Sequence, residues 1–249
     1  MQLDVFQADF KLYDSITRTY AADIIRMVLR IAAVKYDEVL IDECSDDWQR
    51  LKQDMPLWSL PVLEIDGLKI AGTTTICRHL AWRFGLSGQT AADDAVVDML
   101  SDLLHEGSQV LECWRNAIKN NDGSDFQLIS LDENARHYVS TRLGPILEKY
   151  LCMNAKGFLV GDKMTWADIM AISVFKTFFE NDREDLLSAF PLIRQHYARF
   201  SPAVAAHPEK VSNEDAVKSD RMDHYPNDID QMKQSLKKNV DPHHMVVLT

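Results

Sequence analysis

The spacing of apolar positions predicts a first part of the chain that alternates strands and helices. Short apolar runs at 10–16 and 36–41 are typical of strands. Between them, the segment 21–33 places Ile24, Val28 and related residues on one face of a helix. A strand–helix–strand order predicts two parallel strands joined by a crossover helix.

The next segments complete a small α/β domain. We expect a short helix at 47–52, followed by strands at 62–65 and 68–71 around the hairpin signal Asp66-Gly67. Thr73 is expected to be the N-cap of a further helix. The predicted order, βαβ followed by ββα, is the thioredoxin-like layout, with the first and last helices covering one face of the sheet.

Beyond residue 90 the pattern becomes helical. The turn-rich segment 85–90 predicts a boundary, and the long amphipathic stretches 96–118 and 130–153 predict helices. Thr165 and Asp168 have the spacing of a capping box that starts another helix. We therefore expect a thioredoxin-like domain at 1–86, an all-helical domain at 91–208 and a largely disordered polar tail at 209–249.

Charge and cysteine usage narrow the function classes. The net charge of −11 disfavours nucleic acid and anionic membrane surfaces as partners. No apolar run approaches the ~20 residues of a membrane helix, and the amino-terminal residues lack the basic region of a signal peptide. The four cysteines form no CxxC pair and no metal-binding spacing. A cytoplasmic protein without a metal site is expected.

Two sequence blocks, about 100 residues apart, carry a family resemblance. The first runs from Trp48 through Leu60-Pro61 to Asp66-Gly67, and the second is Gly161-Asp-x-x-Thr165-Trp-Ala-Asp168. Together they resemble the glutathione transferase superfamily, and the first resembles its sigma class. The resemblance spans roughly 10–208 and implies a homodimer that conjugates reduced glutathione to small hydrophobic electrophiles, or isomerises them.

The resemblance implies that a tyrosine hydroxyl at the end of the first strand stabilises the glutathione thiolate. Here Asp14 stands at that position when the strands are matched, and Tyr13 lies one residue earlier. Counting back from the following helix places Ser15 there instead, and other classes of the superfamily use a serine. Tyr13, Ser15 and the absence of any activating hydroxyl therefore remain three alternatives.

The resemblance also implies a set of glutathione contacts. Trp48 and Lys52 match the residues at the glycyl end, and Leu60 with a cis Pro61 matches the backbone that pairs with the cysteinyl part. Gly72 and Thr73 match the residues at the γ-glutamyl group, and Ser59 stands where relatives carry a longer side chain. Glu106 matches a carboxylate that reaches the γ-glutamyl amine across the dimer interface.

Several of these contacts are lost in this chain. Gly72 has no side chain, Ser59 is short, and Ala21 replaces an arginine at the start of the first helix. Losing two charge-assisted hydrogen bonds would weaken binding by roughly two to four orders of magnitude. We therefore weigh a weakened transferase against a non-catalytic member of the S-crystallin type.

The electrophile pocket is expected between the domains. Tyr13 or Ile16 would line one side, and Val110, Cys113 and Trp114 of the first long helix would line the other. The three tail histidines, His224, His243 and His244, have no companion ligands at metal spacing and receive no site.

Overall fold

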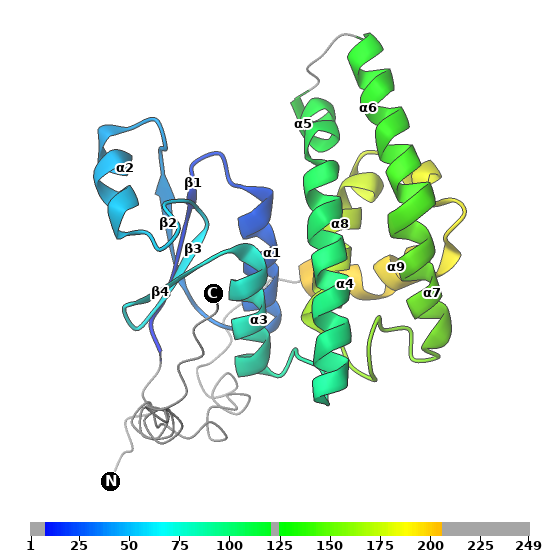
Figure 1. Ribbon diagram of the computed structural model, residues 1–249, viewed down its shortest axis with the longest axis horizontal. Helices are drawn as coiled ribbons and strands as arrows, with labels where there is room; N and C mark the ends of the chain where they lie inside the picture. Colours follow the sequence, from blue (N-terminus) through cyan, green and yellow to red (C-terminus); the bar gives the residue numbers. More distant parts are fainter. Residues whose placement is uncertain (1–7, 121–124, 206–249) are drawn as a thin grey trace, which may run out of the picture.

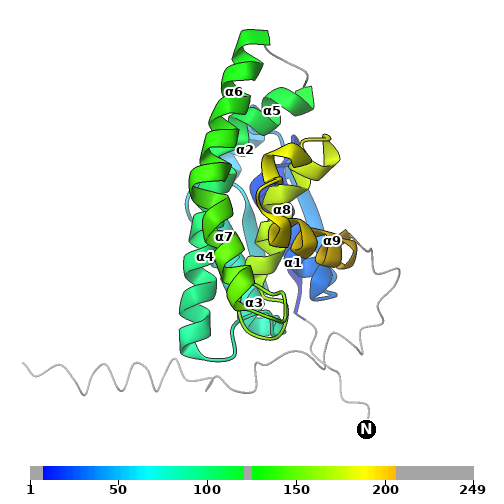
Figure 2. The ribbon, with the colours of Figure 1, turned by 90° about the vertical axis from the view of Figure 1, so that its right-hand side faces the viewer.

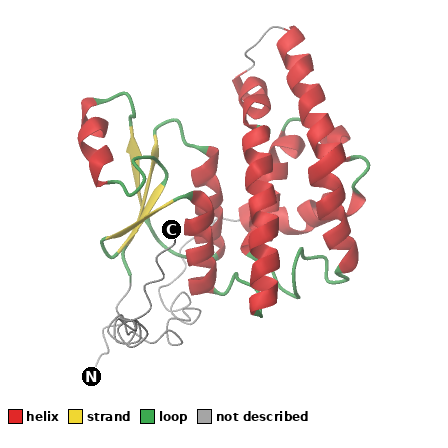
Figure 3. Ribbon diagram, viewed as in Figure 1, coloured by secondary structure: helices red, strands yellow, loops and turns green. Residues whose placement is uncertain are grey.

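The computed structural model describes residues 8–120 and 125–205, which form two packed units side by side (Figure 1). Strands occur in the first unit, and the second is built from helices (Figure 3). Both parts of the predicted fold class are confirmed. The segment 209–249 lies outside the described residues, so its predicted disorder stays a prediction.

The first unit is a four-stranded mixed sheet with three helices. Its elements are β1 (Phe10–Ser15), α1 (Tyr20–Ile31), β2 (Asp37–Ile41), α2 (Asp46–Leu51) with a 3-10 turn (Lys52–Asp54), β3 (Val62–Ile65), β4 (Leu68–Ala71) and α3 (Thr73–Phe84). The strand order is β2-β1-β3-β4. β1 is parallel to β2 and antiparallel to β3, and β3 is antiparallel to β4, as the strand–helix–strand and hairpin patterns predict.

The two faces of the sheet have different cover. α1 and α3 pack on one face, where Leu12, Leu63 and Ile76 are fully buried (Figure 1). α2 lies on the opposite side, and Trp48 is 4% exposed there in a smaller apolar cluster with Ile41 and Val62. Residues of β1 therefore alternate between the main core and the α2 side.

The start of α3 corrects one expectation. Gly72, not Thr73, occupies the N-cap position, and Thr73 is the first helical residue. The chain leaves β4 with φ +88° at Gly72, a conformation that favours glycine. No side chain caps this helix.

The second unit packs its helices around α8. Its elements are α4 (Ala91–Val110), α5 (Glu112–Asn120), α6 (Asp125–Tyr138), a π-helical turn (Val139–Leu143), α7 (Gly144–Met153), α8 (Trp166–Glu180), a 3-10 turn (Glu184–Leu187) and α9 (Pro191–Ala205). α8 contacts α4 and α9 and also α1 of the first unit (Figure 2). The predicted stretch 96–118 is thus two helices, separated at Leu111.

The capping box at the start of α8 is confirmed. The Asp168 carboxylate is 0% exposed and accepts hydrogen bonds from the Thr165 amide and hydroxyl at 2.8 and 2.9 Å. It also accepts from the Leu159 amide at 2.8 Å and lies 2.9 Å from His196 Nε2. Asp168 therefore ties the incoming loop and α9 to the start of the central helix.

Candidate active site between the two domains

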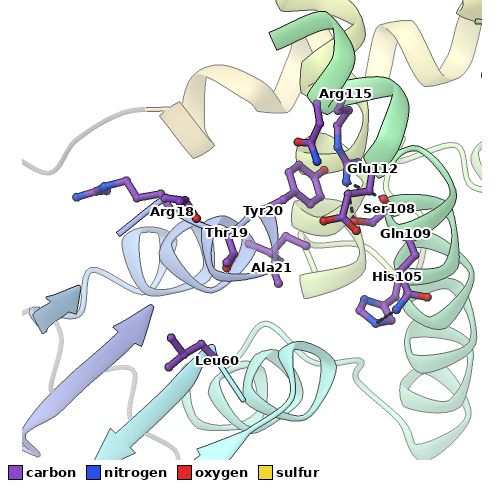
Figure 4. A pocket seen from close by; sticks show the side chains of 13 residues that line it. Arg18, Thr19, Tyr20, Ala21, Leu60, His105, Ser108, Gln109, Glu112 and Arg115 are labelled. Atoms are coloured by element: carbon purple, nitrogen blue, oxygen red, sulfur yellow. Dashed lines mark hydrogen bonds between the residues drawn. The ribbon is translucent and has the colours of Figure 1, made fainter. Parts of the chain in front are cut away.

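A cavity of about 600 Å³ lies where the first unit meets α4 and α5 (Figure 4). One side is the loop from β1 to α1, residues 17–19, with Tyr20, Ala21 and Ile24 at the start of α1 and Leu60 ahead of β3. The other side is one face of α4 and α5, formed by His105, Ser108, Gln109, Glu112, Arg115 and Asn116. Because both units contribute, the cavity is an interdomain site of the kind that commonly binds small ligands.

The peptide bond between Leu60 and Pro61 is cis, as predicted. Leu60 lies on the cavity wall, and β3 begins one residue after Pro61, at Val62. Among the ten predicted site residues, all of which the structure describes, Leu60 is the one that lines this cavity.

A buried charge network holds the loop from β1 to α1. Asp14 is 0% exposed and accepts hydrogen bonds from the Thr19 hydroxyl at 2.7 Å and from Arg26 Nη2 at 2.6 Å. Arg26 also donates to Glu38 and Asp23, each at 2.6 Å. Burial opposes the charge of Arg26, but the hydrogen bonds to Asp14 and Glu38 raise its pKa above the usual value. Asp14 thus fixes the loop that lines the cavity.

Tyr13 lies on the α2 side of the sheet, opposite the face that α1 and α3 cover. It packs with the α2-side cluster, and its hydroxyl donates a 2.9 Å hydrogen bond to Glu64 Oε2 on β3. Burial and the neighbouring Glu64 carboxylate raise the pKa of Tyr13 to about 12. A hydroxyl that gives its proton to a carboxylate is not free to donate to a thiolate in the cavity.

This geometry makes a prediction about the titration of Tyr13. Its phenol should ionise near pH 12, so the ultraviolet difference spectrum between the protein and Tyr13→Phe should show one phenolate forming there. Because the folded pKa is the higher one, the stabilisation is complete below the ordinary tyrosine pKa of ~10 and is lost as pH rises toward 12. A difference spectrum with its midpoint at or below pH ~10 would contradict the Glu64 contact.

Ser15 lies closer to the cavity. It is the last residue of β1, and its Oγ is 3.0 Å from Oγ1 of Thr17, which lines the cavity wall. The Thr17 amide also donates to Ser15 Oγ at 3.4 Å. Of the two predicted hydroxyls, Ser15 is therefore the one that the fold places beside the cavity.

The residues predicted for the glycyl end lie on and after α2. The Trp48 side chain packs in the α2-side apolar cluster, and Ser45 Oγ accepts its backbone N–H at 3.2 Å. Lys52 is half-buried at the end of the helix, and Ser59 is exposed. Structural packing accounts for Trp48, whereas no ion pair within the described part of the chain accounts for Lys52.

At the γ-glutamyl position the main feature is the start of α3. Thr73 is buried, and the Gly72 carbonyl accepts the Ile76 amide at 2.9 Å. The first amides of a helix have no partner within it and carry the positive end of the helix dipole. Without a capping side chain, this end of α3 can accept a carboxylate.

Glu106 turns away from the cavity, toward the helices of its own domain. Its carboxylate accepts two hydrogen bonds from Arg142, at 2.9 and 2.8 Å, and one from the Tyr138 hydroxyl at 3.3 Å. Arg142 lowers the pKa of Glu106. This side chain is therefore engaged within the chain itself.

The residues expected to form an apolar wall for the electrophile do not line this cavity. Trp114 is buried in the core, whereas Val110 and Cys113 are exposed outside the cavity lining. Ile16 and Tyr13 are likewise absent from the described lining. Trp114 thus belongs to the core, and polar residues of α4 and α5 face the cavity.

Within 8–120 and 125–205, no three His, Cys, Asp or Glu residues are grouped closely enough to hold a metal ion. None of the helices in these ranges has both the length and the apolar character that crossing a bilayer requires.

Comparison with known proteins identifies the family of this chain. Residues 21–88 match the family model for the glutathione S-transferase N-terminal domain, and residues 132–219 match that for the C-terminal domain. The chain is 34% identical over 179 residues to the probable glutathione S-transferase gst-36 of Caenorhabditis elegans, covering 68% of this chain and 80% of the relative.

The chain is also similar to an S-crystallin and to a solved glutathione S-transferase structure. S-crystallin 4 of Enteroctopus dofleini is 30% identical over 203 residues, covering 77% of this chain and 92% of that protein. The crystal structure of monomeric Na-GST-3 from Necator americanus superposes with a TM-score of 0.66 at 27% identity, covering 79% of this chain and 94% of that one. The chain belongs to the glutathione S-transferase family.

Proposed function

We propose that this protein is a glutathione transferase that binds reduced glutathione in the interdomain cavity and joins it to a small electrophile. The observation that carries the proposal is the position of Leu60. In a chain of this family, Leu60 lines a cavity to which both domains contribute. The thiolate of glutathione would attack the electrophilic carbon, the leaving group would depart with the bonding electron pair, and the thiol proton would pass to solvent.

Glutathione would lie beside the segment that precedes β3. We propose that the Leu60 backbone pairs with its cysteinyl part as an added strand would. The uncapped start of α3, with Thr73, would receive the γ-glutamyl carboxylate. Lys52 would pair with the glycyl carboxylate beside Trp48. We propose that one extended tripeptide reaches from Leu60 in the cavity wall to these groups, which lie outside the cavity lining.

Glutathione binding is expected to be weaker than in a typical family member. Ala21 lines the cavity where the resemblance expects an arginine, and Gly72 and Ser59 supply no long polar side chain. The loss of two charge-assisted contacts corresponds to roughly two to four orders of magnitude in affinity.

Ser15 is the hydroxyl that we propose for activating the thiol. Replacing it with alanine should lower kcat for conjugation of an aryl halide by about 100-fold, the effect typical of removing one preorganised donor. Tyr13→Phe should leave kcat within about twofold, because its hydroxyl is bound to Glu64 on the α2 side. Steady-state kinetics with saturating glutathione measures both effects. If Tyr13→Phe abolished turnover and Ser15→Ala did not, Tyr13 would be the activating group.

The second candidate is a non-catalytic member of the S-crystallin type. The internal pairing of Glu106 with Arg142 favours it, because that carboxylate is already neutralised, as do the lost contacts at Ala21 and Gly72. A protein of this type would pass through a glutathione-agarose column and would show no turnover of aryl halides.

We also propose a cytoplasmic homodimer. Leu57 and Trp58 are 66% and 64% exposed in the loop before β3, and Met99 is exposed on α4, so two copies could cover apolar surface on both domains. The cysteines Cys44, Cys77, Cys113 and Cys152 are all free thiols, which is typical of a reducing compartment. Light scattering of the purified protein measures the oligomeric state.

A further inference from the structure

The cavity wall on α4 and α5 is polar where an apolar wall is expected. Its six residues present an imidazole, a hydroxyl, two amides, a carboxylate and a guanidinium to the space between the domains (Figure 4). Leu60 lies on the sheet side of the same space, and Arg115 lies on the helix side (Figure 4). The second ligand would therefore meet a polar surface.

Arg115 has an unusual environment for a charged group. It is 7% exposed, and its Nη2 donates to the Ser108 carbonyl at 2.6 Å and to the Ser108 hydroxyl at 3.3 Å. Its Nη1 has no hydrogen-bond partner. Among the described residues no carboxylate forms an ion pair with it, and burial lowers the pKa of the guanidinium.

Tyr20 holds the guanidinium in place. The Arg115 Cζ lies 3.7 Å from the centre of the Tyr20 ring, a cation–π contact. The Tyr20 hydroxyl is buried on the core side, where it interacts with Ser173 of α8. Arg115, which lines the cavity, thus holds one charged donor with unused hydrogen-bonding capacity, and a buried unpaired donor is costly.

We propose that the helix side of the cavity binds the carboxylate of an anionic second ligand through Arg115. A planar carboxylate matches the charge and shape of the guanidinium and can accept the unused Nη1 hydrogen bond. The inference deepens the proposed function, because it assigns the ligand class of the half-cavity beside glutathione. The two carboxylates of glutathione have their own partners in Lys52 and the start of α3, so they do not require Arg115.

Glu112 is expected to weaken the binding of an anion at the same wall. Its exposed side chain lines the same wall, one helical turn before Arg115. A carboxylate there repels an incoming anion and partly compensates Arg115, so removing its charge should strengthen anion binding. Arg115 and Glu112 therefore predict opposite changes from substitutions three residues apart.

The test compares two unreactive probes, 3,5-dinitrobenzoate and 3,5-dinitrobenzamide, by calorimetric titration into the full-length protein. The benzoate should bind about tenfold more tightly than the amide, which has the same ring and no charge. Arg115→Gln should abolish this preference, and Arg115→Lys should retain part of it. Glu112→Gln should increase benzoate affinity severalfold and leave amide affinity unchanged, and this exposed variant is informative even if the Arg115 variants do not fold.

Equal binding of the two probes, absence of benzoate binding at millimolar concentration, or a preference that survives Arg115→Gln would each overturn the proposal. A Glu112→Gln variant that binds the two probes as the unchanged protein does would also overturn it. Glutathione is titrated separately into the same preparations. If glutathione fails to bind while the benzoate preference is present, the transferase proposal fails and the anion site stands; the reverse result removes the anion site alone.

Discussion

Replacing Arg26 with methionine is expected to lower the free energy of unfolding by about 3–5 kcal/mol, the cost of removing one partner from a buried ion pair. Methionine preserves much of the side-chain length but leaves the fully buried Asp14 carboxylate with Thr19 as its remaining partner. Because Thr19 lies in the loop that lines the cavity, the variant should also bind glutathione more weakly. Urea unfolding measures the first effect.

Arg18→Ala is the matched control for this prediction. Arg18 also makes an ion pair with Glu38, at 2.8 Å, but its side chain is 53% exposed, against 6% for Arg26. An exposed pair of this kind contributes about 0–1 kcal/mol. Similar losses for Arg18→Ala and Arg26→Met would show that the buried network does not hold the loop.

Replacing Asp168 with alanine is expected to lower the free energy of unfolding of the otherwise unchanged protein by ~3–5 kcal/mol. The substitution leaves the buried amides of Leu159 and Thr165 without their acceptor and removes the partner of His196. It therefore loosens the central helix α8 from both the preceding loop and α9. Chemical unfolding followed by circular dichroism measures the loss.

Glu180→Ala, at the other end of the same helix, is the control for Asp168→Ala. Its pair with Lys176 is exposed, with an N–O distance of 3.5 Å, and its removal should change stability by less than about 0.5 kcal/mol. A loss of under about 1 kcal/mol for Asp168→Ala would mean that water or neighbouring groups replace its hydrogen bonds.

The architecture of the first domain was predictable because its signals are local. Apolar runs, the Asp66-Gly67 turn and the strand–helix–strand order each depend on a few neighbouring residues, and each predicted strand is present. The capping box of α8 was predictable for the same reason. The N-cap of α3 was missed by one residue because the positive φ at Gly72 depends on how the chain leaves the sheet.

Helix α9 was not predicted, although the sequence holds a signal for it. Its buried residues Ile193, His196, Phe200 and Val204 follow helical spacing. The histidine conceals this pattern when apolar residues alone are counted. Its burial depends on Asp168, 28 residues earlier, and such a long-range contact cannot be read from local spacing.

The chemistry of the cavity was less predictable than the fold. Helical spacing does not distinguish an apolar residue that lines a pocket from one that packs in the core, and Trp114 packs in the core. The residues of α4 and α5 that line the cavity are polar, and Arg115 is one of them. Similarly, the sequence shows Asp14 only as a departure from the family pattern. In the structure it accepts hydrogen bonds from Thr19 and Arg26 and so has a structural role.

Isothermal titration of reduced glutathione into the full-length protein, together with Lys52→Ala and Arg50→Ala, tests the central claim most directly. Both variants remove one positive charge from the region of α2, but Arg50 is 80% exposed and pairs with Asp47 instead. We predict a wild-type Kd no weaker than about 1 mM, a roughly 10- to 100-fold loss for Lys52→Ala and little change for Arg50→Ala. Absence of binding at millimolar glutathione, or equal losses in the two variants, would contradict the account.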